Sequence, residues 1–173
     1  MSAAMYPVGT SILYGRTGVC RVEGIGTPHF QKDDGQTYYT LRSVFSTSGE
    51  LIYVPVDTVA SMRPLIGREE AADYLGLISQ LEPKSFGSKK PAELIAHYQE
   101  MLASCHPRDC LLLIKEVYWK QKSLKKLGQV DTRYLKIAER LVCEELAAVL
   151  DTKPESIRKR LYSAIEQRVD MCQ

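Results

Sequence analysis

The feature that most limits the fold of this chain is a set of short strand-like segments within residues 6–63. Each segment is rich in β-branched, aromatic or aliphatic residues, and glycine or serine turns separate them. Gly15 and Gly18 bound the first turn and give it the backbone freedom that a tight reversal needs. The segments are Ser11–Tyr14, Val19–Ile25, Thr37–Val44 and Leu51–Val56. Four or five strands joined by short loops, with no helix between them, predict a small SH3- or Tudor-like antiparallel β-barrel.

Pro55 indicates where that barrel has a rim. Proline has no N–H to donate to a strand ladder, so the strand that contains it belongs at an edge or ends there. An edge strand presents unpaired backbone groups, which can accept a strand from a partner. Two interpretations stay open from the sequence: a short edge that its proline blunts, or an edge that binds another protein.

After Arg63 the hydrophobic period changes from two to 3.6, the period of an α-helix. Proline and glycine residues divide this half into separate helices. The expected helices are Arg68–Leu81, Lys89–Ala103, Pro107–Lys126, a fourth that begins near Asp131 and a fifth that opens at Thr152. We therefore predict an α+β protein with a barrel domain at residues 1–66 and an all-helical domain of four to five helices at residues 67–173.

The helical half is expected to carry a basic surface. Between Lys84 and Lys126 there are nine basic and four acidic residues, an excess that suits a polyanion. The third helix should place Trp119 opposite its apolar stripe, where the ring could stack on bases or pack on a neighbouring helix. The lysines around this position are Lys115, Lys122 and Lys126, and the fourth helix adds the row Arg133, Lys136 and Arg140, which could also be a solvated face.

No pattern in the sequence is typical of an enzyme, a metal site or a membrane protein. Cys105-His106 with Cys110 lacks the second Cys/His pair that a tetrahedral zinc site needs. Phosphate-binding loops and nucleophile motifs are missing. No apolar run approaches the roughly 20 residues of a membrane span, and the N-terminus has no signal pattern. We expect a non-catalytic cytoplasmic monomer without a metal or cofactor.

The order of the motifs resembles the CarD family of bacterial transcription regulators. The resemblance begins with Tyr-Pro-Val-Gly-Thr-Ser-Ile-Leu-Tyr-Gly at residues 6–15 and continues through Tyr-Tyr-Thr-Leu-Arg at 38–42. It includes Ile-Tyr-Val-Pro-Val at 52–56 and Met-Arg-Pro-Leu-Ile at 62–66. In the helical half, residues 117–128 and 138–147 resemble the family's basic helix with its turn and its Ala-Arg-x-x-x-x-Glu-Leu-Ala segment.

That resemblance implies a function for each half of the chain. The N-terminal module would be an RNA polymerase interaction domain that docks on the polymerase β subunit. The helical domain would bind duplex promoter DNA with little sequence preference at the upstream edge of the bubble and stabilise the open complex, which implies a nucleoid-associated protein. Polymerase contacts would fall near Pro28 and on the strand Ile52, Tyr53 and Val54, without the arginines that the family often has at positions 28 and 53.

The family also has a tryptophan wedge near the start of its second helix, and this chain has Leu94 at that place. Leu94 could insert between base pairs in its stead, or belong to the core stripe of its own helix. The resemblance leaves Trp119 and Phe86 as substitutes for the wedge, or a purely electrostatic contact. Two other functions stay open: a protein–protein adaptor that does not bind DNA, and an RNA-binding module.

Overall fold

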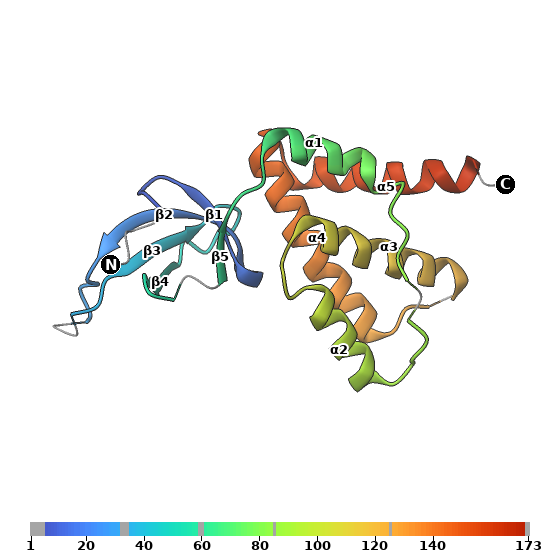
Figure 1. Ribbon diagram of the computed structural model, residues 1–173, viewed down its shortest axis with the longest axis horizontal. Helices are drawn as coiled ribbons and strands as arrows, with labels where there is room; N and C mark the ends of the chain where they lie inside the picture. The colour runs from blue at the N-terminus through green and yellow to red at the C-terminus, as the bar shows by residue number, and fades with distance from the viewer. Residues whose placement is uncertain (1–5, 32–34, 59–60, 85, 125, 172–173) are drawn as a thin grey trace. The chain divides into compact units, whose positions relative to one another are not determined.

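The computed structural model describes residues 6–31, 35–58, 61–84, 86–124 and 126–171 (Figure 1). The chain divides into two compact units, Met1–Leu65 and Ile66–Gln173. The first contains the strands and the second contains the helices. The boundary falls one residue before the one expected from the sequence.

The first unit is a five-stranded antiparallel sheet with the strand order β4-β3-β2-β1-β5. One turn of 3-10 helix, Gly15–Thr17, joins the first two strands. Gly15 and Gly18 there have φ values of 45° and 95°, which residues with a Cβ rarely adopt. The strands are β1 Ser11–Tyr14, β2 Gly18–Gly26, β3 Tyr38–Ser43, β4 Leu51–Pro55 and β5 Met62–Pro64.

The core of this unit comes from alternate residues of the strands, because successive side chains of a strand point to opposite faces. The ring of Tyr39 packs in this core, and Tyr6 lies over it with ring centroids 6.0 Å apart. The buried cluster is Ile12, Cys20, Val22, Tyr39, Leu41, Val54 and Met62. The alternation of side chains with a period of two therefore predicted this sheet correctly.

The sheet of this unit is open, because β4 and β5 lie at opposite ends of the strand order. The prediction of an α+β fold with a small Tudor-like strand module is confirmed. The prediction that Pro55 marks an edge is also confirmed, because β4 pairs with β3 alone among the described strands.

The second unit consists of five helices, and α4 packs against each of the other four. Its buried residues Tyr134, Ala138, Leu141 and Val142 recur at the spacing of one helix face. No helix in the described part of the chain is long and apolar enough to span a bilayer. The helices are α1 Arg68–Leu77, α2 Pro91–Met101, α3 Pro107–Ser123, α4 Gln129–Leu150 and α5 Pro154–Met171.

Several helix ends differ from the sequence-based prediction, and α2 spans Pro91–Met101 rather than Lys89–Ala103. Helix α1 ends at Leu77 rather than at Leu81, and α3 ends at Ser123 because Leu124 is already extended (φ −113°, ψ 139°). Gly128 is therefore the N-cap of α4 and not the end of α3. Asp131 was expected to cap the fourth helix, but it lies inside the first turn of α4, where it is buried.

Candidate partner-binding edge and candidate nucleic-acid interface

The hydrogen-bond phase of the edge strand β4 determines which of its backbone groups face outward. The N–H of Val56 donates to the carbonyl of Thr37 over 2.9 Å, just past the last β3–β4 pair. Antiparallel pairs alternate between bonded and non-bonded, so Val54 and Ile52 bond to β3. The N–H and C=O groups of Tyr53 and Leu51 then point away from the sheet. β4 can accept a strand along these two residues.

Pro55 ends this edge in two ways. It has no N–H, and its carbonyl accepts hydrogen bonds from the N–H and the hydroxyl of Thr58, at 3.0 and 3.1 Å. The outward groups of the edge are thus confined to Leu51 and Tyr53. An added strand would be held by few backbone bonds, which makes the side chains beside the edge important for affinity.

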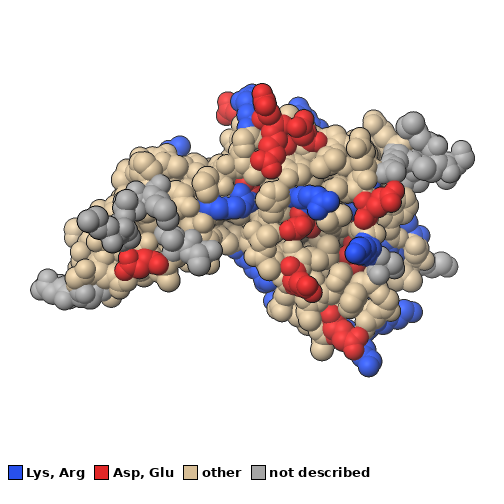
Figure 2. All heavy atoms as spheres, viewed as in Figure 1, with Lys and Arg blue, Asp and Glu red and all other residues tan. Residues whose placement is uncertain are grey.

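Exposed apolar side chains gather beside this edge. The rings of Phe30 and Tyr53 meet edge to face with centroids 4.8 Å apart. Phe30 is 67% exposed, Tyr53 is 36% exposed and Leu51 is 40% exposed. Over the sheet unit, the described atoms in Figure 2 are mostly uncharged. This aromatic pair and Leu51, together with the β4 backbone, form the candidate partner-binding edge.

The four residues expected at the polymerase contact differ in exposure. Tyr53 faces solvent and Ile52 is half-buried against the core. Val54 is 4% exposed and Pro28 is buried, so their side chains belong to the interior. Sequence reasoning missed Phe30, which lies within a short turn in which Gln31 N–H donates to the carbonyl of Pro28. A lone aromatic residue in a polar loop was the available signal.

Five of the sequence-predicted cations lie exposed near the end of α3 and along α4. Lys122 sits over the ring of Tyr118 at 5.3 Å, and Arg140 pairs with Glu144 at 3.4 Å. Basic and acidic side chains are interspersed on the helical unit in the view of Figure 2. The sequence-predicted cations that the structure places on the surface are Lys122, Lys126, Arg133, Lys136 and Arg140.

Lys115 does not lie on the exposed basic face where the sequence analysis placed it. Its side chain is 2% exposed. The ammonium group donates to the backbone carbonyls of Ile78 and Ser79 over 2.8 and 2.9 Å, where α1 has just ended. The last carbonyls of a helix lack partners within the helix and carry negative partial charge. Lys115 thus caps α1 from the neighbouring helix.

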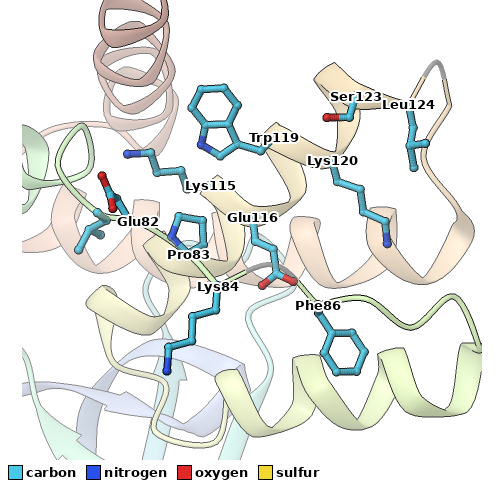
Figure 3. Close-up of a pocket in the computed structure, with 11 residues that line it drawn as sticks. Glu82, Pro83, Lys84, Phe86, Lys115, Glu116, Trp119, Lys120, Ser123 and Leu124 are labelled. Carbon is cyan, nitrogen blue, oxygen red and sulfur yellow. The ribbon is translucent and has the colours of Figure 1, made fainter. Parts of the chain in front are cut away.

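The three wedge candidates lie in different surroundings. Leu94 is 6% exposed, so it belongs to the core stripe of α2, the second of the two places that the sequence left open. Phe86 stacks flat on His97, with ring centroids 4.1 Å apart and planes 2° apart. Trp119 is 41% exposed. It contacts Tyr118 edge to face and lines a cleft between α3 and the α1–α2 linker (Figure 3).

Beneath this cleft lies a network of buried polar groups. The two carboxyl oxygens of Glu116 lie 2.9 and 3.1 Å from the Nε2 atom of His97, within hydrogen-bond distance. Burial raises the pKa of the Glu116 carboxyl, while His97 and Lys120 act in the opposite direction. Asp131 accepts a hydrogen bond of 2.6 Å from the hydroxyl of Tyr98 and one of 2.8 Å from the ammonium of Lys120. These bonds hold α2, α3 and α4 together.

Comparison with known protein families finds a match for the strand unit. Residues 6–66 match the model of the CarD-like/TRCF RID domain. The strand unit is therefore similar to that domain. No curated protein matches the chain. The match supports RNA polymerase interaction and a role in transcription, and it ends where the helical unit begins.

Domains of the CarD-like/TRCF RID family are non-catalytic protein-interaction modules. Within the described residues, no three His, Cys, Asp or Glu side chains group as a metal site would require. Cys105 and Cys110 are both buried.

Proposed function

We propose that this chain is a transcription regulator that binds the RNA polymerase β subunit through the β4 edge of its RID domain and duplex promoter DNA through its helical unit. The observation that carries the proposal is the RID match at residues 6–66 together with an edge strand that has outward backbone groups. A regulator with these two contacts would stabilise the open complex and act in the cytoplasm, on the nucleoid.

The polymerase contact is tested by retention of the purified full chain on core RNA polymerase. Tyr53→Glu should weaken retention at least about tenfold, because it removes a large apolar contact and adds a charge to the patch. Phe30→Ala should act in the same direction. Val8→Glu is the matched control, since Val8 is 59% exposed but precedes β1, which two other strands separate from β4. Equal retention of Tyr53→Glu and the native chain would remove β4 from the contact.

Strand addition itself is tested by proline. Tyr53→Pro deletes an N–H that faces away from β3, so the ladder of the sheet loses no bond. Tyr53→Val keeps that N–H while also losing the ring. Weaker retention for Tyr53→Pro than for Tyr53→Val is the result expected of an added strand. If the two variants bind alike, the side chains alone hold the partner.

The DNA contact is proposed for Lys122, Lys126, Arg133, Lys136 and Arg140. Phosphate contacts release counterions, so four of them would give a slope of about −3.6 in log affinity against log salt. Lys136→Glu should weaken binding to all duplex sequences alike, because phosphates carry no sequence information. Lys159→Glu makes the same charge change at an exposed position of α5 and should have little effect.

The interspersed acidic side chains of the helical unit favour a second function, a protein adaptor that does not bind DNA. The intact chain would then show no duplex binding at low salt while it retained polymerase. Stronger competition by single-stranded RNA than by duplex DNA would indicate an RNA-binding module instead. Open-complex lifetime with and without the chain tests the regulatory step, and an unchanged lifetime would argue against it.

A further inference from the structure

The cleft between α3 and the α1–α2 linker has the size and lining of a small-molecule site. Its volume is about 640 Å³, within the roughly 300–1,000 Å³ of ligand pockets. Trp119 and Leu124, the exposed large hydrophobic residues in the described part of the helical unit, both line it. Leu81, Pro83 and Phe86 complete the apolar wall from the linker, as Figure 3 shows for Pro83 and Phe86.

The walls of this cleft are fixed by contacts behind them. Phe86 is stacked on His97, and His97 is hydrogen-bonded to Glu116 of α3. Lys120 is held by Asp131 at the start of α4. A site whose walls are already held loses little conformational freedom when a ligand enters.

The charges around the cleft favour a ligand with one negative charge. Glu116 is paired with His97, and Lys120 is paired with Asp131. The basic lining residues Lys84, Lys115 and Lys120 outnumber the acidic ones, Glu82 and Glu116. Lys84 is exposed on the linker, where its flexible side chain can reach an anionic group at the mouth.

We propose that this cleft binds a small planar aromatic anion, with the flat apolar body against Trp119, Leu124 and Phe86 and the charge at Lys84. The site is separate from the proposed DNA surface, because Lys122, Lys126, Arg133, Lys136 and Arg140 do not line the cleft. Its occupancy therefore does not depend on the proposed function. A ligand held there would contact both the linker and α3, which would make the cleft an effector site in the helical unit.

Trp119 makes the test specific, because it is the single tryptophan of the chain. The probe is 8-anilinonaphthalene-1-sulfonate, an aromatic anion with a flat naphthalene ring system, titrated into the full chain with excitation of Trp119. Energy transfer to one saturable site is expected. Leu124→Gln and Phe86→Ala should each weaken probe affinity about tenfold. If Phe86→Ala merely unfolded the unit, probe fluorescence would rise, and Leu124, which is 42% exposed, can be replaced without a core defect.

The charge preference is tested with N-phenyl-1-naphthylamine, which has the same aromatic body without the sulfonate. Lys84→Gln should weaken the anionic probe about two- to fivefold and leave the neutral probe unchanged. Lys89→Gln, an exposed lysine of the same linker that does not line the cleft, is the control and should change neither. Absence of energy transfer or equal affinity of both probes would overturn the proposal.

Discussion

Replacement of Lys115 by methionine separates a structural lysine from a DNA-binding one. The substitution keeps the length of the side chain and removes the ammonium group that donates to the carbonyls of Ile78 and Ser79. The first carbonyl lies in the interior and would lose its partner, at a cost of about 1–3 kcal/mol. The second is only partly buried and can be hydrated. Relief from burying a charge offsets part of the loss.

We expect a net destabilisation of about 2 kcal/mol, which lowers the urea midpoint by about 1 M at a typical denaturant slope. Trp119 emission follows the transition, since the single tryptophan lies in the helical unit. Lys122→Met, at an exposed position of the same helix, should stay within about 0.5 kcal/mol.

The affinity for duplex DNA should rank the two variants in the opposite order. Per folded molecule, Lys115→Met should leave DNA binding unchanged, whereas Lys122→Met should weaken it. Unchanged stability together with weaker DNA binding for Lys115→Met would refute the capping role.

Three other changes test the polar interior. Burial raises the folded-state pKa of Glu116 above its ordinary value of 4.5, so the free energy of unfolding should fall as pH rises through that raised pKa. Glu116→Gln should lack this part of the fall in pH-dependent urea titrations. Tyr98→Phe removes the 2.6 Å bond to Asp131 and should cost about 1–2 kcal/mol in the same assay. Burial, then Glu139, raises the pKa of Cys143 to about 12, so Cys143→Ser should not change the number of fast-reacting thiols in the native chain.

The strand unit could be predicted from sequence because its determinants are local. Alternating side chains define each strand, and Gly15 and Gly18 supply φ values that only glycine adopts easily. Pro55 identified the edge because a missing N–H has the same consequence in any sheet. The outward backbone groups of Leu51 and Tyr53 were not predictable, since they depend on the pairing phase between β3 and β4.

The helical unit was predicted less completely because its burial is tertiary. The period of 3.6 identified Leu113 and Val117 as core, but Leu124 of the same predicted stripe is exposed because α3 ends before it. A helical projection of the sequence predicts a solvated side chain for Lys115. The carbonyls of Ile78 and Ser79 just past the end of α1, 37 and 36 residues distant in sequence, give its ammonium group interior partners.

The same contacts limit how a wedge into DNA could work in this chain. A wedge must leave its packing to enter a base step, so the loss of that packing is subtracted from what insertion gains. Leu94 would open a core defect, and Phe86 would give up its stack on His97. Trp119 already exposes 41% of its surface and would lose least. A duplex contact with an inserted side chain therefore favours Trp119 over the position that the CarD resemblance indicates.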